Sequence, residues 1–315
     1  MNEKKISIII PTCNREHILE ETVAKALDAI REKSAEIIVV NDGDKPTILP
    51  DIFSGKIKIL ENNKGGVSRA RNLGAAQAAG QVLFFVDDDM WINKEIIDWI
   101  ETNLTDNKEE DAVYNVNWEY PPELNNELKE SKIGRFLLSN GYNTMWGRMK
   151  QKAVKPISGL YLFDTIGSCS FIISKQTFEK IGGYKDSITF QGEDIELSIR
   201  LNHLKIPIYC LFDITLFHNH RDRIDINNYL NRIRDGYNSQ FMAERKGLLP
   251  RSGYSYQKNK LELSIYNMLS APEVCSMWLL KILPNNKIFD PVSNSIIGLL
   301  SGIIKFKQWK NAFAV

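Results

Sequence analysis

The chain has 315 residues, of which 43% are hydrophobic and 25% are charged, the balance of an ordinary globular protein. Lysine and arginine number 40 against 39 acidic residues, and this net charge of +1 excludes a global attraction to nucleic acid. The four cysteines, Cys13, Cys169, Cys210 and Cys275, form no C-x-x-C pair, which argues against a disulfide framework or a structural zinc site. Together with an N-terminal segment that lacks the apolar length of a signal peptide, this predicts a cytoplasmic protein with reduced thiols.

Short apolar runs separated by helical patterns organise the first 90 residues. The runs that have the length and composition of strands are residues 6–10, 37–40, 57–60 (the weakest) and 82–86. Such runs are typical of strands buried on both faces, as in a parallel sheet. Residues 19–30 and 67–79 have helical spacing, with Asn14 as the expected N-cap of the first helix. We therefore expect an α/β fold with a mainly parallel, twisted sheet flanked by helices, in which 6–10, 37–40 and 82–86 are neighbouring central strands.

The pattern is looser after residue 90. Residues 112–118 and 168–173 resemble strands, and residues 176–181 resemble a short helix. The segment 119–160 has the composition of long loops with short helices, and residues 227–315 are mostly helical in pattern.

Polar residues follow three of the predicted strands and would meet at one edge of a parallel sheet. The segments are Pro11-Thr12-Cys13-Asn14-Arg15, Asn41-Asp42-Gly43-Asp44 and Asp87-Asp88-Asp89. Three adjacent carboxylates repel one another unless a cation neutralises them, and oxygen ligands favour Mg²⁺ or Mn²⁺. A metal there could bridge the phosphates of a nucleotide diphosphate, whereas the alternatives are a solvated acidic turn or a helix N-cap.

Two further elements of the amino-terminal half suit a nucleotide. Asp42 could accept a hydrogen bond from a base or ribose, although a turn residue before Gly43 has the same signature. A helix that begins after Gly65-Gly66 could hold phosphate with help from Arg71, but the segment lacks the G-x-G-x-x-G spacing of a dinucleotide site.

The carboxyl-terminal half adds an acidic segment and a pair of histidines. Gly192-Glu193-Asp194-Ile195-Glu196 is followed by apolar residues whose spacing suits a helix or a strand, and acidic residues at its start favour the helix. Asp194 is a candidate general base at the edge of a cleft, the alternative being a favourable acidic first turn. Phe217-His218-Asn219-His220 follows a predicted strand, so its histidines could contact a metal or phosphate or serve a structural role.

Taken together, in their order and spacing, these segments resemble the family 2 glycosyltransferases with the GT-A fold over about residues 5–220. The matching segments are S-I-I-I-P-T-C-N-R, E-I-I-V-V-N-D-G, G-V-S-R-A-R-N-L-G-A, F-F-V-D-D-D-M, I-G-G-Y, G-E-D-I-E-L-S-I-R-L and Phe217-His218. The resemblance implies a metal-dependent enzyme that moves a sugar from a nucleotide-diphosphate sugar, expected to be a UDP-sugar, to an acceptor hydroxyl. It further implies inversion at the anomeric carbon, with Asp194 as the general base.

The resemblance also implies a role for each matching residue. The expected nucleotide-sugar contacts are Pro11, Thr12, Arg15, Asp42, Arg71, Asp87 and Asp88. The expected ligands of a Mn²⁺ or Mg²⁺ ion are Asp87, Asp89 and His218. Cys13 departs from the family, in which an aromatic residue often stacks on the base at this position, so base stacking would come from elsewhere.

On this basis residues 1–222 are expected to form the transferase domain and residues 223–315 a helical C-terminal extension. Within the first, 1–118 would bind the donor, and 119–222 would meet the acceptor, which could be a glycan, a lipid-linked molecule or another hydroxyl compound. A homo-oligomer is compatible with the sequence. Residues 296–310 place apolar residues beside lysines and a tryptophan, which suits an interfacial helix at the inner face of the membrane. A helix packed on the domain or on a dimer partner is the alternative.

Other classes of protein fit the sequence less well. A nucleotidyltransferase that acts on a sugar phosphate would also use a nucleotide, a metal and carboxylates, and a retaining GT-A transferase would share the fold. A glycoside hydrolase needs two carboxylates but no nucleotide pocket, and a carbohydrate-binding module needs no acidic metal cluster.

Overall fold

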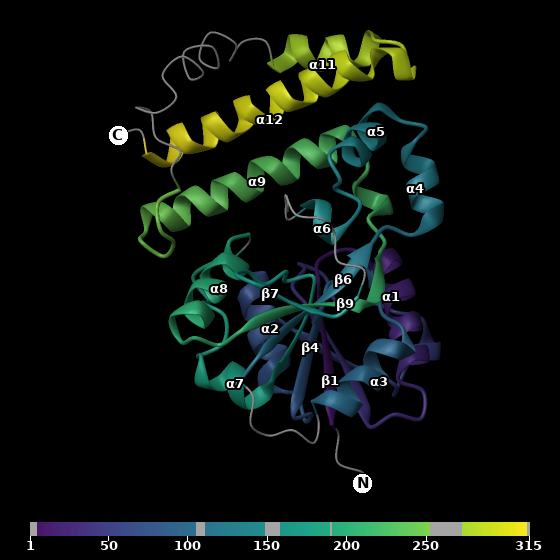
Figure 1. Cartoon of the computed structure of the whole chain (residues 1–315), viewed down its shortest axis with the longest axis vertical. Helices are drawn as coiled ribbons and strands as arrows, with labels where there is room; N and C mark the ends of the chain where they lie inside the picture. Colours follow the sequence, from purple (N-terminus) through teal and green to yellow (C-terminus); the bar gives the residue numbers. More distant parts are fainter. Residues whose placement is uncertain (1–4, 105–110, 149–157, 190, 253–272, 314–315) are drawn as a thin grey trace. The chain divides into compact units, whose positions relative to one another are not determined.

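The computed structural model describes residues 5–104, 111–148, 158–189, 191–252 and 273–313. By internal contacts the chain forms two compact units, the first made of residues 1–120 and 151–219 and the second of residues 121–150 and 220–315 (Figure 1). This division places residues 121–150 with the C-terminal helices. The domain limits expected from the sequence, at 118 and 222, remain a prediction about functional domains.

A nine-stranded sheet runs through the first unit, counted over the described residues. Its strands are β1 (Ile6–Thr12), β2 (Ala35–Asn41), β3 (Lys58–Glu61), β4 (Val82–Val86), β5 (Met90–Trp91), β6 (Val113–Glu119), β7 (Leu160–Phe163), β8 (Ser170–Ser174) and β9 (Ile208–His218). The strand order is β3-β2-β1-β4-β8-β6-β9-β5, and β7 pairs with β9. The three predicted central strands are therefore neighbours, as expected.

The sheet is mixed rather than mainly parallel. The pairs β2–β3, β1–β2, β1–β4 and β6–β9 are parallel. Strand β8 runs antiparallel to β4 and β6, and β5 and β7 run antiparallel to β9. The parallel arrangement predicted from the sequence thus holds for β1 to β4. The direction of the later strands could not be read from their composition, because a strand buried on both faces has the same apolar pattern in either direction.

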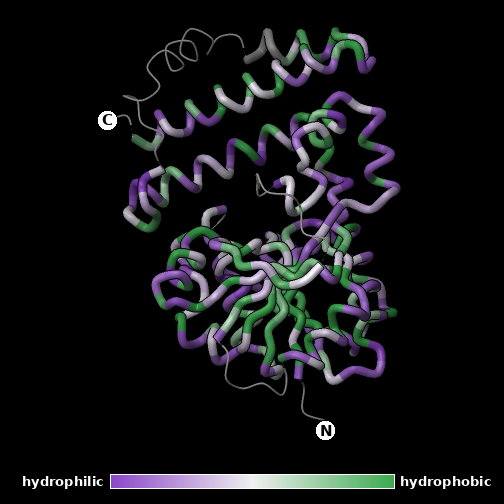
Figure 2. Tube along the Cα trace, in the orientation of Figure 1, coloured by the Kyte–Doolittle hydropathy of each residue, from purple (hydrophilic) through white to green (hydrophobic). Residues whose placement is uncertain are grey.

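Helices cover both faces of this sheet. They are α1 (Glu16–Ala29), the 3-10 helix η1 (Asp51–Phe53), α2 (Val67–Ala76), α3 (Lys94–Asn103), α7 (Lys175–Lys180) and α8 (Glu193–His203). Figure 1 shows α1 and α3 on one side of the sheet and α2, α7 and α8 on the other. On the latter side Phe85 of β4 stacks on Phe171 of β8, with ring centroids 4.8 Å apart, and both belong to one buried cluster. Figure 2 shows the strands as hydrophobic segments at the centre of the unit.

The helix boundaries test two predictions from the sequence, the N-cap of the first helix and the structure of residues 193–203. Asn14 is not the N-cap of α1: it has a left-handed backbone with φ 55°, and Arg15 is the cap residue, without a side-chain cap bond. The sequence 193–203, whose spacing suited either a helix or a strand, is helix α8. Its cap residue Gly192 has φ 103°, a conformation that glycine adopts without strain and that lets the chain turn sharply before Glu193.

The second unit consists of helices in its described residues. They are α4 (Pro122–Leu128), α5 (Lys132–Ser139), α6 (Met145–Arg148), the 3-10 helix η2 (Arg221–Arg223), α9 (Ile226–Arg245), α11 (Glu273–Ile282), the 3-10 helix η3 (Lys287–Phe289) and α12 (Asp290–Phe313). Leu230 of α9 packs against Leu300 and Ile304 of α12 in its core. Over the described ranges, none of the helices combines the length and apolar character needed to cross a bilayer.

Candidate functional site

The carboxyl ends of β1, β2 and β4 bring the polar segments of the sequence together. The backbone N–H of Asp42, directly after β2, donates to the carbonyl of Thr12 at the end of β1, with N···O 2.7 Å. The hydroxyl of Thr12 in turn donates to Asp88 Oδ2, just beyond β4, at 2.8 Å. The polar segments that were expected to meet at one edge of the sheet are therefore joined by hydrogen bonds across the ends of three strands.

Arg15 joins the second and third aspartates of the triplet. Its Nη1 forms an ion pair with Asp88 Oδ1, and its Nη2 lies 3.0 Å from Asp89 Oδ2. Asp88 is 5% exposed and Asp89 is fully buried. Buried carboxylates are costly unless they are paired and hydrogen-bonded, so Arg15 offsets part of the repulsion that the sequence predicted for this triplet.

Asp89 also meets the histidines that follow β9. Met90 of β5 pairs with His218 of β9, and this register places Asp89 Oδ1 2.9 Å from His218 Nε2. His220 follows two residues later, and ligand atoms of Asp89, His218 and His220 lie within 4.8 Å of one another in buried surroundings. The ring centroids of Trp118 and His218 are 4.7 Å apart and the ring planes are nearly perpendicular, so the indole packs against the imidazole.

The chemistry of this triad fits a metal ion. One carboxylate and two imidazoles form a mixed oxygen and nitrogen donor set, which suits a transition metal better than Mg²⁺, an ion that prefers oxygen ligands. His220 was not among the predicted ligands, although the sequence signal, two histidines separated by one residue after a strand, was present. Asp87, which was among them, is directed to a different partner.

That partner is Arg71 of α2, which is 2% exposed. Its Nη2 donates to Asp87 Oδ1 at 2.9 Å, and its Nη1 donates to Glu193 Oε1 at 3.0 Å. The guanidinium carbon lies 5.3 Å from the centre of the Tyr184 ring, so the cation also faces an aromatic π system. Arg71 thus links the end of β4 to the first turn of α8, two segments more than 100 positions apart in sequence.

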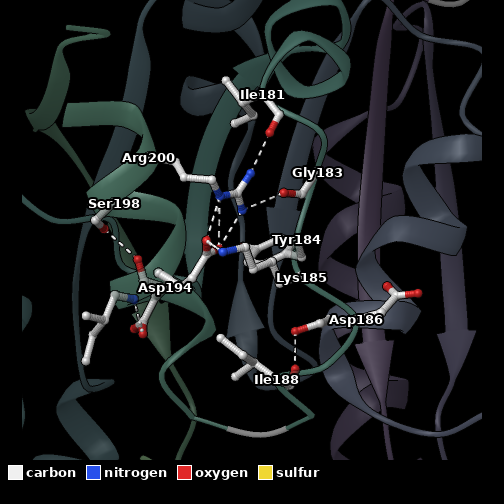
Figure 3. Close-up of polar contacts among 12 residues, drawn as sticks. Ile181, Gly183, Tyr184, Lys185, Asp186, Ile188, Asp194, Ser198 and Arg200 are labelled. Atoms are coloured by element: carbon white, nitrogen blue, oxygen red, sulfur yellow. Dashed lines mark hydrogen bonds and ion pairs between the residues drawn. The ribbon is translucent and has the colours of Figure 1, made fainter. Parts of the chain in front are cut away.

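Asp194 lies beside this link, in the first turn of α8. Burial, and next the negative charge of Glu193, raise the pKa of Asp194 from 3.8 to about 7. The backbone carbonyl of Asp194 accepts a hydrogen bond from Ser198 Oγ at 2.6 Å (Figure 3). A carboxyl that titrates near neutrality can be ionised in the resting state and still take up a proton, which is the requirement for a general base.

The three acidic residues of this turn are distinguished by their partners. Glu196 is buried and is held by Arg200, whose Nε and Nη2 lie 2.6–3.0 Å from its carboxylate, and by Lys185 Nζ at 2.8 Å. Arg200 also donates to the carbonyls of Ile181 and Gly183, so this network fastens the I-G-G-Y turn to α8. Glu196 therefore has a structural role that the sequence did not reveal.

The remaining predicted donor contacts lie at the same sheet edge. Pro11 is buried near the end of β1, and Cys13 just after it is exposed. Asn62 Nδ2 donates to Asp42 Oδ1 at 2.6 Å, while burial raises the pKa of the Asp42 carboxyl. An acceptor oriented by an amide in this way suits the recognition of a polar group, and the role of Asp42 remains a prediction.

The fold and this site define an α/β domain whose polar groups gather where the parallel strands end. In open α/β sheets, ligands such as nucleotides bind at this position. Residues 7–178 match the family described as Glycosyl transferase family 2. The chain therefore belongs to glycosyl transferase family 2, which confirms both the family and the glycosyltransferase class predicted from its motifs.

Several curated proteins share part of this sequence. The glycosyltransferase GlyA of Streptococcus pneumoniae is 33% identical over 121 residues, 36% of this chain and 17% of that protein. The poly(ribitol-phosphate) beta-N-acetylglucosaminyltransferase TarS of Staphylococcus aureus is 33% identical over 100 residues, 30% of this chain and 18% of that protein. An inactive polypeptide N-acetylgalactosaminyltransferase-like protein 5 of Macaca fascicularis is 27% identical over 77% of this chain and 60% of that protein. The match thus spans less than a fifth of the two bacterial relatives.

Solved structures are similar at lower identity. Residues 1–349 of S. aureus TarS align with 98% of this chain and 90% of that one, at 13% identity and a TM-score of 0.47. A structure of GalNAc-T7 with UDP, GalNAc and Mn²⁺ aligns with 68% of this chain and 43% of that one, at 15% identity and a TM-score of 0.49.

Proposed function

We propose that this chain transfers a sugar from a UDP-sugar to a hydroxyl group of a glycan, lipid-linked or other acceptor, with inversion at the anomeric carbon. The observation that carries the proposal is the buried link through Arg71. It ties Asp87, at the strand end where a nucleotide diphosphate is expected, to the turn that holds Asp194. The proposed donor site and the proposed base, whose pKa is raised to about 7, would thereby lie at the same edge of one sheet.

In the proposed reaction Asp194 acts as the base. Its carboxylate takes the proton of the acceptor hydroxyl while the hydroxyl oxygen forms a bond to the anomeric carbon. The bond between that carbon and the diphosphate oxygen breaks on the opposite face, and the diphosphate leaves with the electron pair. The product therefore has the anomeric configuration opposite to that of the donor.

The donor contacts are proposed as the sequence predicted them: Pro11, Thr12, Arg15, Asp42, Arg71, Asp87 and Asp88. Asp42 would accept a hydrogen bond from the base or ribose. Since Thr12 and Arg15 both bond to the carboxylate of Asp88, we propose that Asp88 acts by orienting Arg15 toward the phosphates. Cys13 leaves this pocket without the aromatic ring expected to stack on the base.

Asp89, His218 and His220 would hold a divalent metal ion, and their two imidazoles favour Mn²⁺ over Mg²⁺. When bound, such an ion would neutralise the negative charge that develops on the leaving diphosphate. Asp87, predicted as a direct ligand, remains a proposed ligand, and Arg71 bonds to one of its two carboxylate oxygens.

The proposal is tested with the full chain, a panel of nucleotide-sugars and a panel of hydroxyl acceptors, with product configuration determined by NMR. Transfer from a UDP-sugar with inversion is the expected result. Retained configuration would point to a retaining transferase. Formation of a nucleotide-sugar and pyrophosphate from a sugar phosphate and a nucleoside triphosphate would point to a nucleotidyltransferase. The cytoplasmic location expected from the sequence remains part of the proposal.

A further inference from the structure

The second unit carries a compact group of exposed apolar side chains at the turn between α11 and α12. The members of this group, called here the apolar patch, are Trp278, Leu279, Ile282, Ile288 and Val292. Their exposed fractions run from 44% for Leu279 to 79% for Ile288. Thirteen large hydrophobic residues are exposed among the described residues, and five of them fall within these 15 positions. Clustering of this kind marks an interaction surface, whereas single exposed apolar residues do not.

The turn is fastened by its polar groups, which leaves the apolar side chains facing outward. Lys132 of α5 donates to the carbonyls of Leu280 and Leu283, at 2.6 and 2.5 Å, where α11 ends. Asn285 donates to the carbonyl of Glu130 at 2.7 Å. Leu280, the neighbour of Leu279, is 6% exposed and faces the interior of the unit. The same helix therefore buries one apolar side and presents another to solvent.

The segment that carries the apolar patch has more basic than acidic residues. Lys281 and Lys287 are exposed and lie in the same short segment. Asp290 is the only acidic residue in the sequence from 277 to 292, and its carboxylate accepts from Arg135 Nε at 2.8 and 2.9 Å. Arg135 thus pairs with the one acidic residue of this segment, and Lys281 and Lys287 are its remaining charged side chains.

For residues 296–310 the burial of apolar side chains favours the alternative expected from the sequence, a helix packed on the protein itself. Residues 296–310 suggested an interfacial helix, but Ile297, Leu300, Ile303 and Ile304 are at most 1% exposed. The pairing of α12 with α9 in the core explains this burial, since Leu300 and Ile304 pack against Leu230. These four residues belong to the interior of the unit, and the residues of the apolar patch precede them in sequence.

We propose that the apolar patch, with Lys281 and Lys287, binds the surface of an anionic lipid bilayer. Its tryptophan and aliphatic side chains would enter the boundary between headgroups and acyl chains, while the lysines would pair with lipid phosphates. A bilayer fits this surface better than a protein partner does, because lysine is depleted in protein–protein interfaces and enriched beside tryptophan at membrane interfaces.

The test is co-sedimentation of the full chain with vesicles of phosphatidylcholine, alone or mixed with phosphatidylglycerol. Binding is expected for the anionic vesicles and is expected to weaken with added salt. The double variant Lys281→Gln/Lys287→Gln should lower the partition coefficient roughly 30-fold at low ionic strength. Trp278→Ser/Ile288→Ser should lower binding to both kinds of vesicle. A matched control is Ile48→Ser/Leu204→Ser, which removes exposed apolar residues of the first unit and should leave binding unchanged.

Equal binding of the wild type and both patch variants would overturn the proposal. So would the absence of vesicle binding combined with a dimer, measured by light scattering, that Trp278→Ser/Ile288→Ser dissociates, because the apolar patch would then be covered by a second copy of the chain. Point variants are preferable to deletion of residues 292–315, since the deletion would remove seven buried residues of α12. An unchanged thermal midpoint confirms that the exposed substitutions leave the fold intact.

Discussion

Arg71 and Glu193, 122 residues apart in sequence, share a buried ion pair with Nη1···Oε1 3.0 Å. The other end of the guanidinium bonds to Asp87 at 2.9 Å, so one cation is held by two carboxylates from different elements. Burying a charge is costly without such partners, and each member of the group therefore depends on the others. This relationship connects the triplet after β4 with the acidic turn of α8, the two motifs that the sequence showed only separately.

Removal of Arg71 should destabilise the fold. Arg71→Met leaves Asp87 and the buried Glu193 without their shared cation, and breaking a buried pair in this way typically costs about 3–5 kcal/mol of unfolding free energy. Arg71→Lys keeps the charge but loses the planar guanidinium that bonds to two carboxylates, and it should lower the unfolding free energy by less. Urea denaturation checks both. In the double variant Arg71→Met/Glu193→Gln the loss should be smaller than in Arg71→Met alone, and strictly additive effects would contradict the coupling.

Asp194→Asn should abolish most of the turnover while leaving donor binding nearly unchanged. A general base typically contributes a hundred- to ten-thousand-fold to the rate, and the amide cannot accept the acceptor's proton. Steady-state kinetics and calorimetric titration with a nucleoside diphosphate separate the two effects. Glu193→Gln serves as the neighbouring control and should lose less turnover. Near-normal turnover in Asp194→Asn would exclude this residue as the base.

The rate should depend on pH through Asp194. With a pKa of about 7, the carboxyl is protonated and inactive as a base at lower pH, so kcat should fall below about pH 7 and level off above it. The raised pKa also means that the folded state binds this proton more tightly than the unfolded state. The contribution of Asp194 to stability should accordingly increase as the pH falls from about 7 toward the ordinary value of 3.8. A pH–rate profile without a group near neutrality would contradict the first expectation.

Nucleotide binding should require the metal triad. Chelation should weaken the binding of UDP, and Mn²⁺ should restore it more fully than Mg²⁺ because two of the three donors are imidazoles. His218→Ala and Asp89→Asn should remove this metal dependence in calorimetric titrations. His203→Ala, which changes a histidine on α8 outside the triad, is the matched control. Full metal-dependent binding in Asp89→Asn would show that the ion is held elsewhere.

Cys13 should report on occupation of the nucleotide pocket, although slowly at neutral pH. The side chain is exposed, but neighbouring residues remove part of its hydration, and this loss, followed by the carboxylates of Asp42, Asp44 and Asp88, raises the pKa of the thiol above its ordinary value of 9.0. Since the thiolate is the reactive form, alkylation should be slower at pH 7 than that of an unstructured cysteine peptide and should accelerate as the pH rises. Bound UDP should protect the thiol. Labelling of Cys13→Ser under the same conditions gives the background, and unchanged labelling with UDP would place Cys13 outside the pocket.

The sequence by itself determined the elements whose signals are local. The apolar runs at 6–10, 37–40 and 82–86 indicated adjacent buried strands, since burial on both faces leaves a continuous apolar pattern, and their polar ends indicated where a site lies. The order of the motifs was enough to predict the family, and the family model confirms it.

Only the tertiary structure decided which side chains meet. The two directions in the sheet, the link from Asp87 through Arg71 to Glu193 and the addition of His220 to Asp89 all depend on contacts between distant segments. The same holds for α12: its apolar residues suited either an interfacial helix or a helix packed on the domain, and packing with α9 buries Leu300 and Ile304, whereas Trp278 and Ile288 before it are exposed. Periodicity reports that a helix has an apolar face, whereas the neighbouring elements determine what covers that face.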